Sequence, residues 1–289
     1  RVAQVSLLPA LFVVGVHLIT PMEEQEASAL FERLSASEHL APLCPPTKPL
    51  PLAGGHFSTV LQVGLQRLEA GDPGVLPHFA HVGEEFVTLF DGFPKSKVHL
   101  LVLPRLRIAG ARDLTAEHLP LARRLTAYVA WLLCELAAQR PELTWRQGVH
   151  SNPSVQQLHV HVLSEDFQSP CMKNKKHYNS FQPPFLLGLE SVLANLEQSV
   201  EGIESALANL EQSVEGGRAC AVPASKEEAE SWLKRDLTCS GCGTCFGNRF
   251  VELKRHLDVC RRPSAATAAA SASAPRASAA AAGGAAWRL

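Results

Sequence analysis

The run that most constrains the fold is Leu158-His-Val-His-Val-Leu163, in which histidines alternate with aliphatic residues. A period of two is typical of a β-strand, because successive side chains of a strand point to opposite faces. His159 and His161 are therefore expected on one face, with the aliphatic residues packed into a core on the other. The run predicts a strand over 157–163 that offers two imidazoles to a functional site.

Imidazole suits nucleophilic attack on phosphorus, since an unperturbed pKa near 6.5 leaves it largely neutral at pH 7. A covalent histidine adduct also divides one difficult displacement into two easier ones. The spacing alone does not decide between this chemistry, a metal-binding pair and two surface histidines. A third histidine, His150, precedes the pair, and a basic run follows at Lys173, Lys175, Lys176 and His177.

Further strands and one long helix are predicted around the histidine strand. Phe86–Phe90 and Val98–Leu103 are apolar runs separated by the turn Asp91-Gly-Phe-Pro94. Apolar residues recur at helical spacing over Thr115–Gln139, with Thr115 as the candidate N-cap. Trp145–His150 is another expected strand. This order predicts an α+β domain with a mostly antiparallel sheet.

The flanking segments differ from this domain in composition. An amphipathic helix is expected over Met22–Leu40, and the proline-rich stretch Pro42–Gly55 is expected to be irregular. Farther along, Glu190–Gly202 recurs from Glu204 almost unchanged, with apolar residues at heptad spacing. The charges flanking this seam are all acidic, so self-pairing lacks complementary partners. A duplicated helical spacer is therefore favoured over a dimerising coiled coil.

The eight cysteines of the chain are unevenly distributed. Cys239, Cys242, Cys245 and Cys260 crowd into one segment, and Cys-x-x-Cys spacing favours a metal in a reducing compartment over disulfides. Cys239 and Cys242, followed by His256 and Cys260, fit a tetrahedral zinc site whose metal would supply the folding energy of so small a module. Cys245 is the rival of Cys239 as a ligand.

Charge is concentrated in the same module. The whole chain has a net charge of −1, so any basic surface must be local. Residues 234–262 carry seven basic and three acidic side chains, which gives +4. Duplex contacts are therefore expected here, with Lys254 and Arg255 as candidates. A purely structural zinc module is the alternative.

Three ordered blocks resemble one known family. Gly148–Ser164 and Asp166–Phe181 are similar to the active-site strand and the following loop of the histidine-triad (HIT) superfamily, in its DNA-adenylate hydrolase branch. Asp91–Pro104 resembles the nucleotide-pocket hairpin of that branch, and Leu237–Cys242 with Phe250–Leu257 resembles its C-terminal zinc finger. The resemblance implies an α+β fold with a HIT-type antiparallel sheet and a long helix, plus a small C-terminal zinc finger.

The resemblance and the composition together divide the chain into five expected parts. These are an N-terminal, partly irregular extension at 1–75, a HIT catalytic domain at 76–187, a duplicated acidic helical spacer at 188–222, a zinc-finger DNA-binding module at 223–262 and a disordered Ala/Ser-rich tail at 263–289.

The resemblance also implies roles for individual residues. His159 would be the nucleophile, and His161 matches the phosphate-contacting histidine that supports it. His150 matches a histidine beside the scissile phosphate. Gln157 occupies the first position of the triad, which is a departure from the family's histidine and leaves the electrostatic tuning of His159 open.

Other matched positions would hold the nucleotide and the DNA. Ser154 matches a phosphate-contacting serine, and Asp91 matches the acid that receives the ribose hydroxyls, although it could simply shape its turn. His99 is either a pocket residue or an ordinary strand histidine. The remaining assignments are Lys95, Ser96 and Lys97 to the nucleotide and Lys173, Lys175, Lys176 and His177 to the DNA end, with a solvated basic loop as the alternative for the latter.

The implied reaction is removal of AMP from the 5′-phosphate of DNA that an aborted ligation left adenylated. One structural zinc ion and no catalytic metal are expected. The implied partner is DNA with an adenylated break, with RNA–DNA junctions as a further candidate. The protein is expected to be a monomer in the nucleus and to have no membrane partner. The apolar stretch Val5–Ile19 is short for a membrane span and lacks a convincing cleavage site for a signal peptide.

Two other functions stay open from the sequence. One is a general HIT hydrolase that acts on free nucleotides, for which a finger and a basic segment would be superfluous. The other is a non-catalytic zinc-finger DNA-binding protein, and Gln157 is the feature that favours it.

Overall fold

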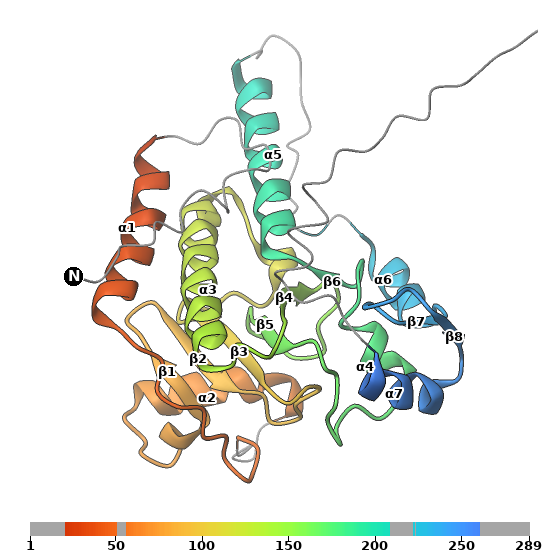
Figure 1. The fold of residues 1–289 in the computed structure, drawn as a ribbon. Coiled ribbons are helices and arrows are strands. Elements are labelled where there is room, and N and C mark those ends of the chain that lie inside the picture. The colour runs from red at the N-terminus through yellow and green to blue at the C-terminus, as the bar shows by residue number, and fades with distance from the viewer. Residues whose placement is uncertain (1–20, 51–55, 209–221, 223, 261–289) are drawn as a thin grey trace, which may run out of the picture.

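The structure, a computed structural model, describes residues 21–50, 56–208, 222 and 224–260. The expectations for 1–20, for the repeat beyond residue 208 and for the tail at 263–289 fall outside these residues. The described chain forms one six-stranded antiparallel sheet with helices on its faces, and a two-stranded sheet in a C-terminal finger (Figure 1). The predicted α+β class with an antiparallel sheet and a long helix is confirmed.

The histidine strand lies inside the six-stranded sheet. The strand order is β1-β2-β3-β5-β4-β6, and every neighbouring pair is antiparallel. His161 on β5 lies opposite Leu101 on β3 and Gly148 on β4. The strands are β1 Phe79–Val82, β2 Phe86–Phe90, β3 His99–Pro104, β4 Trp145–His150, β5 Val160–Ser164 and β6 Leu186–Leu187.

The described helices range in length from five residues in α4 to 21 in α3. They are α1 Pro21–Ser37, α2 Val60–Glu69, α3 Leu119–Gln139, α4 Lys175–Asn179, α5 Leu189–Ala208, α6 Lys226–Trp232 and α7 Phe250–Val259, with 3₁₀ turns at Phe57–Thr59, Leu76–His78, Ala111–Asp113 and Ala116–His118. No helix within the described ranges is both long enough and apolar enough to cross a lipid bilayer.

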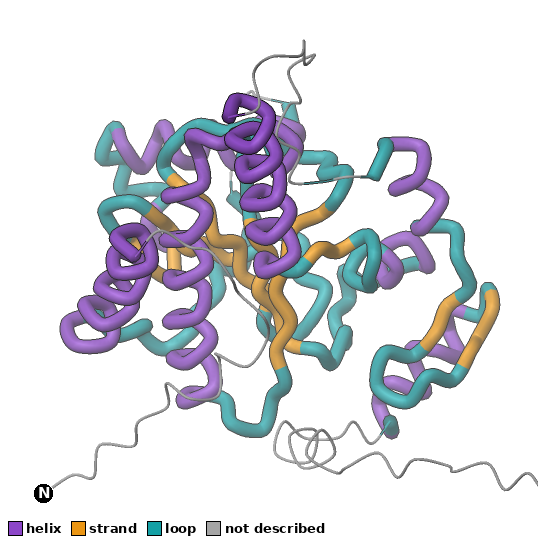
Figure 2. Tube along the Cα trace, turned by 90° about the horizontal axis from the view of Figure 1, so that it is seen from above, coloured by secondary structure: helices purple, strands orange, loops and turns teal. Residues whose placement is uncertain are grey.

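One face of the sheet is covered by α3, α1 and α5 (Figures 1 and 2). Alternate residues of the central strands, such as Val102 and Val160, join a single core with Leu132 and Leu136 of α3. This is the aliphatic side of the histidine strand, and the predicted division of its two faces is therefore confirmed. The histidines lie on the opposite face.

The opposite face is covered in part by α2. Leu61 and Leu65 of this helix pack against Leu89 and Leu101 of the sheet. Strands β2 and β3 are thus buried on both faces. For this reason their sequences are continuously apolar and do not alternate between apolar and polar residues. The part of this face that α2 leaves uncovered carries the candidate site.

The first copy of the repeat belongs to the main core. Leu189, Val192 and Leu196 of α5 are buried in the same cluster as α3. An ion pair joins the two helices, with Arg123 Nη2 3.0 Å from Glu197 Oε1. The apolar residues of this copy are therefore buried against the same chain and not against a second copy of the chain.

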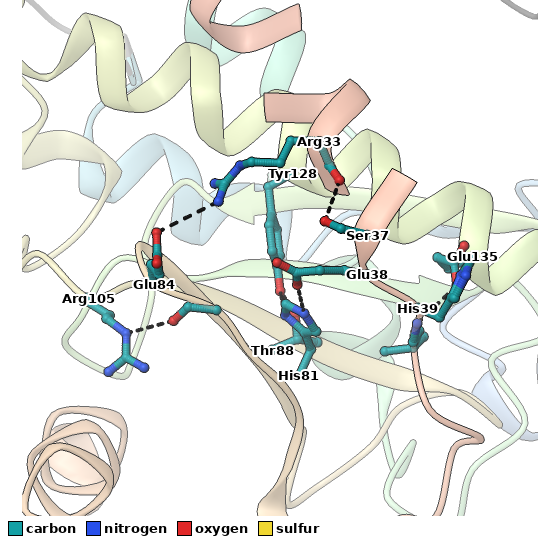
Figure 3. Close-up of polar contacts among 12 residues, drawn as sticks. Arg33, Ser37, Glu38, His39, His81, Glu84, Thr88, Arg105, Tyr128 and Glu135 are labelled. Carbon is teal, nitrogen blue, oxygen red and sulfur yellow. Dashed lines mark hydrogen bonds and ion pairs between the residues drawn. The ribbon is translucent and has the colours of Figure 1, made fainter. Parts of the chain in front are cut away.

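A polar clasp fastens the end of α1 to the sheet (Figure 3). The His81 ring contacts the Glu38 carboxylate through Nε2, and its Nδ1 lies 2.8 Å from the Tyr128 hydroxyl. Thr88 Oγ1 lies 2.8 Å from the same hydroxyl. Burial raises the pKa of Tyr128, so this phenol stays neutral and can donate to His81.

The finger packs directly on the main domain, beyond the β6 edge of the sheet (Figure 1). Its own sheet pairs β7 (Leu237–Thr238) with β8 (Cys245–Gly247), and α7 closes it. Leu253 and Leu257 of α7 are buried in one cluster with Tyr178 and Phe181 of the main domain. The Tyr178 hydroxyl also donates to the Thr238 carbonyl at 3.1 Å.

Candidate functional site

His159 is oriented by the main chain of Gln157. Its Nδ1 lies 2.7 Å from the Gln157 carbonyl oxygen. Because a carbonyl only accepts, Nδ1 carries the proton of the neutral ring, and Nε2 keeps a free lone pair. This is the tautomer that a nucleophilic imidazole requires.

A hydrogen-bond relay sets the tautomer of His161. The main-chain amide of Lys95 donates to His99 Nδ1 at 3.1 Å, so neutral His99 carries its proton on Nε2. That nitrogen donates to His161 Nδ1 at 3.0 Å, which places the His161 proton on Nε2. His161 Nε2 is buried and has no hydrogen-bond partner within the described part of the chain. The relay therefore leaves one unpaired donor for a ligand.

His150 completes the cluster of imidazoles. Its ring lies 4.1 Å from that of His161, and its Nε2 is also buried without a partner among the described residues. Phe181 packs against His99, His150 and His161 with ring centroids 5.0–5.3 Å apart. Two neighbouring imidazoles thus each carry an unpaired ring nitrogen, and both rings pack against Phe181.

Burial lowers the pKa of all four imidazoles. Desolvation takes the pKa of His99 to about 4, lowers that of His159 and lowers those of His150 and His161 well below 6.5. Asp91 opposes the effect at His99 and His159, and Lys95 reinforces it at His99, His150 and His161. The cluster is therefore neutral at pH 7, as the relay requires.

The imidazoles open into a cavity of about 570 Å³, here called the histidine pocket. This volume lies in the usual range for small-molecule sites. Apolar and aromatic side chains can receive a base, while cations and ring nitrogens can receive phosphates. The apolar lining includes Leu50, Phe57, Val60, Leu61, Leu89 and Phe93, and the polar lining includes Asp91, Lys95, His150, Ser154, His159, His161, Lys173, Lys176 and His177.

The hairpin before β3 contributes to the pocket unevenly. Asp91 Oδ2 lies 3.5 Å from His99 Nε2, and Asp91 Oδ1 accepts the Phe93 amide at 2.6 Å, so this carboxylate both shapes its turn and faces the relay. Lys95 bonds through Nζ to the Phe93 carbonyl, and burial lowers its pKa. Ser96 is buried away from the pocket, and the Lys97 amide donates to Asp166 at 3.1 Å.

Asp91, His99 and His161 also form a possible cation site. One ligand atom from each lies within 4.8 Å of the others. A metal there would have to displace the proton shared by the two imidazoles, which lie 3.0 Å apart.

The basic run after the histidine strand lies partly at the histidine pocket and partly against the finger. Lys173 and Lys176 are exposed at the rim of the histidine pocket, and His177 lines it. Lys175 instead contacts the Asn248 side chain and lies 3.6 Å from Asp236, so it bridges to the finger. Ser154 lies at the pocket mouth and is exposed.

Gln157, three residues before β5, has an unusual backbone conformation. It is fully buried with a φ of 86°, and this left-handed backbone is why β5 begins at Val160 and not at residue 157. Its side-chain amide donates to the carbonyls of Pro104 at 2.9 Å and Leu106 at 3.0 Å. Gln157 therefore acts on His159 through its main chain, while its side chain clamps the loop after β3.

The finger brings its four predicted metal ligands together. Cys239, Cys242, His256 and Cys260 each place a ligand atom within 4.8 Å of the others. Two of the sulfurs, those of Cys239 and Cys260, are 3.7 Å apart, which fits roughly 3.8 Å for two thiolates on one tetrahedral zinc. Hydrogen bonds from Thr244 lower the pKa of the Cys242 thiol to about 6, toward the thiolate that zinc needs.

The remaining finger residues have separate places. Cys245 is exposed and lies outside the ligand cluster. Arg255 is exposed on α7, as a DNA contact would have to be. Lys254 on the same helix turns toward the main domain, where its Nζ donates to the main-chain carbonyls of Ser169 at 2.9 Å and Met172 at 3.2 Å.

Several pocket residues were missed by the sequence reasoning. Phe57 and Phe93 line the pocket and meet edge to face at 5.8 Å. Phe93 stands in the matched block Asp91–Pro104 but received no role there, and Phe57 lies outside every matched block. Leu50 comes from the segment expected to be an irregular extension. Phe181 ends the matched block Asp166–Phe181. Its apolar ring beside a polar run is the one sequence feature that indicates a place in the pocket.

Two family models match the chain. The model described as scavenger mRNA decapping enzyme C-term binding matches residues 69–177, and the C2HE / C2H2 / C2HC zinc-binding finger matches residues 182–261. These models bear out the predicted HIT-type domain and zinc finger. Together with the ligand cluster, the second match supports zinc binding by the finger.

Curated relatives extend the match. Aprataxin of Danio rerio is 35% identical over 208 residues, which are 71% of this chain and 55% of that protein. Aprataxin of Gallus gallus is 37% identical over 139 residues, which are 48% of this chain and 41% of that protein. The chain thus spans about half the length of these relatives.

Solved structures agree with this likeness. The aprataxin ortholog Hnt3 in complex with DNA has a TM-score of 0.52 at 25% identity, covering 71% of this chain and 94% of that one. Hnt3 in complex with DNA and guanosine has a TM-score of 0.51 at 25% identity, covering 71% and 95%.

Proposed function

Because the chain is similar to an aprataxin over 71% of its length and matches models of a HIT-type domain and a zinc-binding finger, we propose that it removes AMP from 5′-adenylated DNA ends. The observation that carries the proposal is the His159 ring, whose Nδ1–H is held by the Gln157 carbonyl while its Nε2 keeps a lone pair in the histidine pocket. The complexes of Hnt3 with DNA support a nucleic-acid substrate.

The first step is attack of His159 Nε2 on the phosphorus of the AMP group. A nitrogen–phosphorus bond forms, and the bond from this phosphorus to the bridging oxygen of the DNA 5′-phosphate breaks. The electron pair stays on that oxygen, so 5′-phosphorylated DNA leaves. The Gln157 carbonyl accepts from the resulting imidazolium and disperses its positive charge.

The second step is attack of water on the same phosphorus. The nitrogen–phosphorus bond breaks, AMP leaves with the water's oxygen, and the water's proton passes to solvent while His159 returns to the neutral ring. The Nε2–H of His161 would donate to a phosphoryl oxygen in both steps, and His150 lies beside it. The leaving group is a phosphate, so strong acid catalysis is unnecessary.

The wider setting completes the proposal. One zinc ion in the finger is structural, and the two steps above use no catalytic metal. DNA with an adenylated break is the proposed partner, with RNA–DNA junctions as a second substrate. We further propose that the protein acts as a monomer in the nucleus.

The test is release of AMP from 5′-adenylated nicked DNA, measured for the intact chain and for His159→Ala. We expect turnover by the intact chain and a loss of more than about a thousandfold in the variant. Turnover of free nucleoside phosphoramidates but not of adenylated DNA would favour a general HIT hydrolase. DNA binding with no turnover of either substrate would favour a non-catalytic module.

A further inference from the structure

Lys254 has an unexpected position for a basic residue on a finger helix. Its ammonium is directed at the main domain, where it donates to the carbonyl oxygens of Ser169 at 2.9 Å and Met172 at 3.2 Å. The Gln168 side chain returns a hydrogen bond to the Lys254 carbonyl at 3.2 Å. Both acceptor residues are buried, so these bonds lie at the packed boundary between finger and domain.

The segment that Lys254 holds forms one wall of the histidine pocket. Cys171 lies between the two acceptor residues, and both Cys171 and Lys173 line the pocket. The hydroxyl of Ser169 donates to the Pro94 carbonyl, next to the pocket residue Lys95. Hydrogen bonds therefore run from the finger helix through Ser169 to the nucleotide hairpin.

Apolar packing follows the same route. Leu253, the neighbour of Lys254 on α7, is fully buried in a cluster with Met172 and Phe181. Phe181 in turn packs edge-on against the rings of His99 and His161. One buried cluster thus includes both Leu253 of the finger helix and the Phe181 ring that packs against the imidazoles.

We propose that Lys254 is a positioning residue for the histidine pocket, fixing the pocket wall at 169–173 from the finger. The inference rests on the proposed function only in taking AMP as the ligand. A charge that satisfies two buried carbonyls has a geometric role, since loss of its bonds frees the wall to move. Arg255, exposed on the same helix, has no such contact in the described structure and serves as the matched control.

The experiment compares full-length Lys254→Met, Lys254→Arg and Arg255→Met by AMP affinity in the absence of DNA and by amide hydrogen exchange over 169–177. We expect Lys254→Met to raise the Kd for AMP roughly tenfold and to speed exchange in the wall. Lys254→Arg should restore both properties, because a guanidinium can also donate to two carbonyls. Arg255→Met should leave AMP affinity and exchange unchanged and weaken only DNA binding.

Two outcomes would overturn the inference. One is a Lys254→Met chain that binds AMP and exchanges like the intact chain but loses DNA affinity as Arg255→Met does. The other concerns Ser169→Ala, which leaves Lys254 in place and removes the hydroxyl bonded to Pro94: unchanged exchange and AMP affinity would contradict the route, even if Lys254→Met fails to fold. A chain that binds AMP but leaves adenylated DNA intact would sink the proposed function and not this inference.

Discussion

The residue that most distinguishes the site is Gln157. Its main chain orients His159, the proposed nucleophile, and its side chain donates to the carbonyls of Pro104 and Leu106 at the end of β3. A left-handed conformation in a side-chain-bearing residue costs on the order of 1 kcal/mol or more, so the surrounding hydrogen bonds must hold it in place. The glutamine therefore preserves the orientation of His159 without a histidine at this position.

We predict that Gln157→Ala lowers the free energy of unfolding by about 1–3 kcal/mol, because the carbonyls of Pro104 and Leu106 lose their donor and the first of them is buried. Chemical denaturation measures this change. Gln156→Ala is the control, since Gln156 is exposed, and it should stay within about 0.5 kcal/mol of the intact chain. Equal effects of the two substitutions would show that the clamp contributes nothing.

The proposed role of buried His159 as the nucleophile predicts how activity depends on pH. Attack requires neutral His159, so activity falls as pH drops through its pKa. Because burial lowers that pKa, the acid limb of kcat/KM should lie below pH 6.5. A pH–rate profile with adenylated DNA measures it. An acid limb at or above pH 6.5 would contradict a desolvated imidazole as the nucleophile.

At the scale of elements, the finger depends on its ligand cluster. Cys239→Ser should reduce bound zinc, measured by elemental analysis, from one ion per chain toward none and should loosen the finger. Cys245→Ser is the matched control, because Cys245 is exposed and outside the cluster. Zinc retained by the first variant and lost by the second would reverse the ligand assignment.

The first copy of the repeat is predicted to stabilise the main core. Leu196 is fully buried against α3, so Leu196→Ala should cost about 2–5 kcal/mol in thermal or chemical unfolding. Gln198→Ala, at an exposed position of the same helix, should cost little. A neutral Leu196→Ala would mean that the helix is only a spacer.

The elements show which parts of the fold a sequence can predict. β4 and the two faces of the histidine strand can be predicted, because side chains that alternate with a period of two form a local sequence pattern. α2 was not predicted, since Val60–Glu69 is short and Gly64 interrupts it. The place of α1 in the core cannot be predicted from its own sequence, because Leu30 and Leu34 are buried by packing against α3, which lies far along the chain.

At the scale of the whole molecule, the site is assembled from distant parts of the chain. His159, His161 and the lysines of the pocket rim stand in the matched blocks, so the sequence predicts that they share one site, and in the structure they line the same pocket. The aromatic pair Phe57 and Phe93 and the contacts of Lys254 with the main domain depend on how the domain, α2 and the finger pack. Such side-chain geometry has no local signature in a single sequence.

The central claim is that His159 becomes covalently linked to AMP. The direct measurement is to mix the intact chain with 5′-adenylated nicked DNA, quench the reaction early under conditions that preserve phosphoramidates, and map the adduct by peptide mass spectrometry. The account predicts one AMP on His159 that disappears as free AMP accumulates, and no adduct in His159→Ala. An adduct on another residue, or AMP release at the intact rate from His159→Ala, would contradict it.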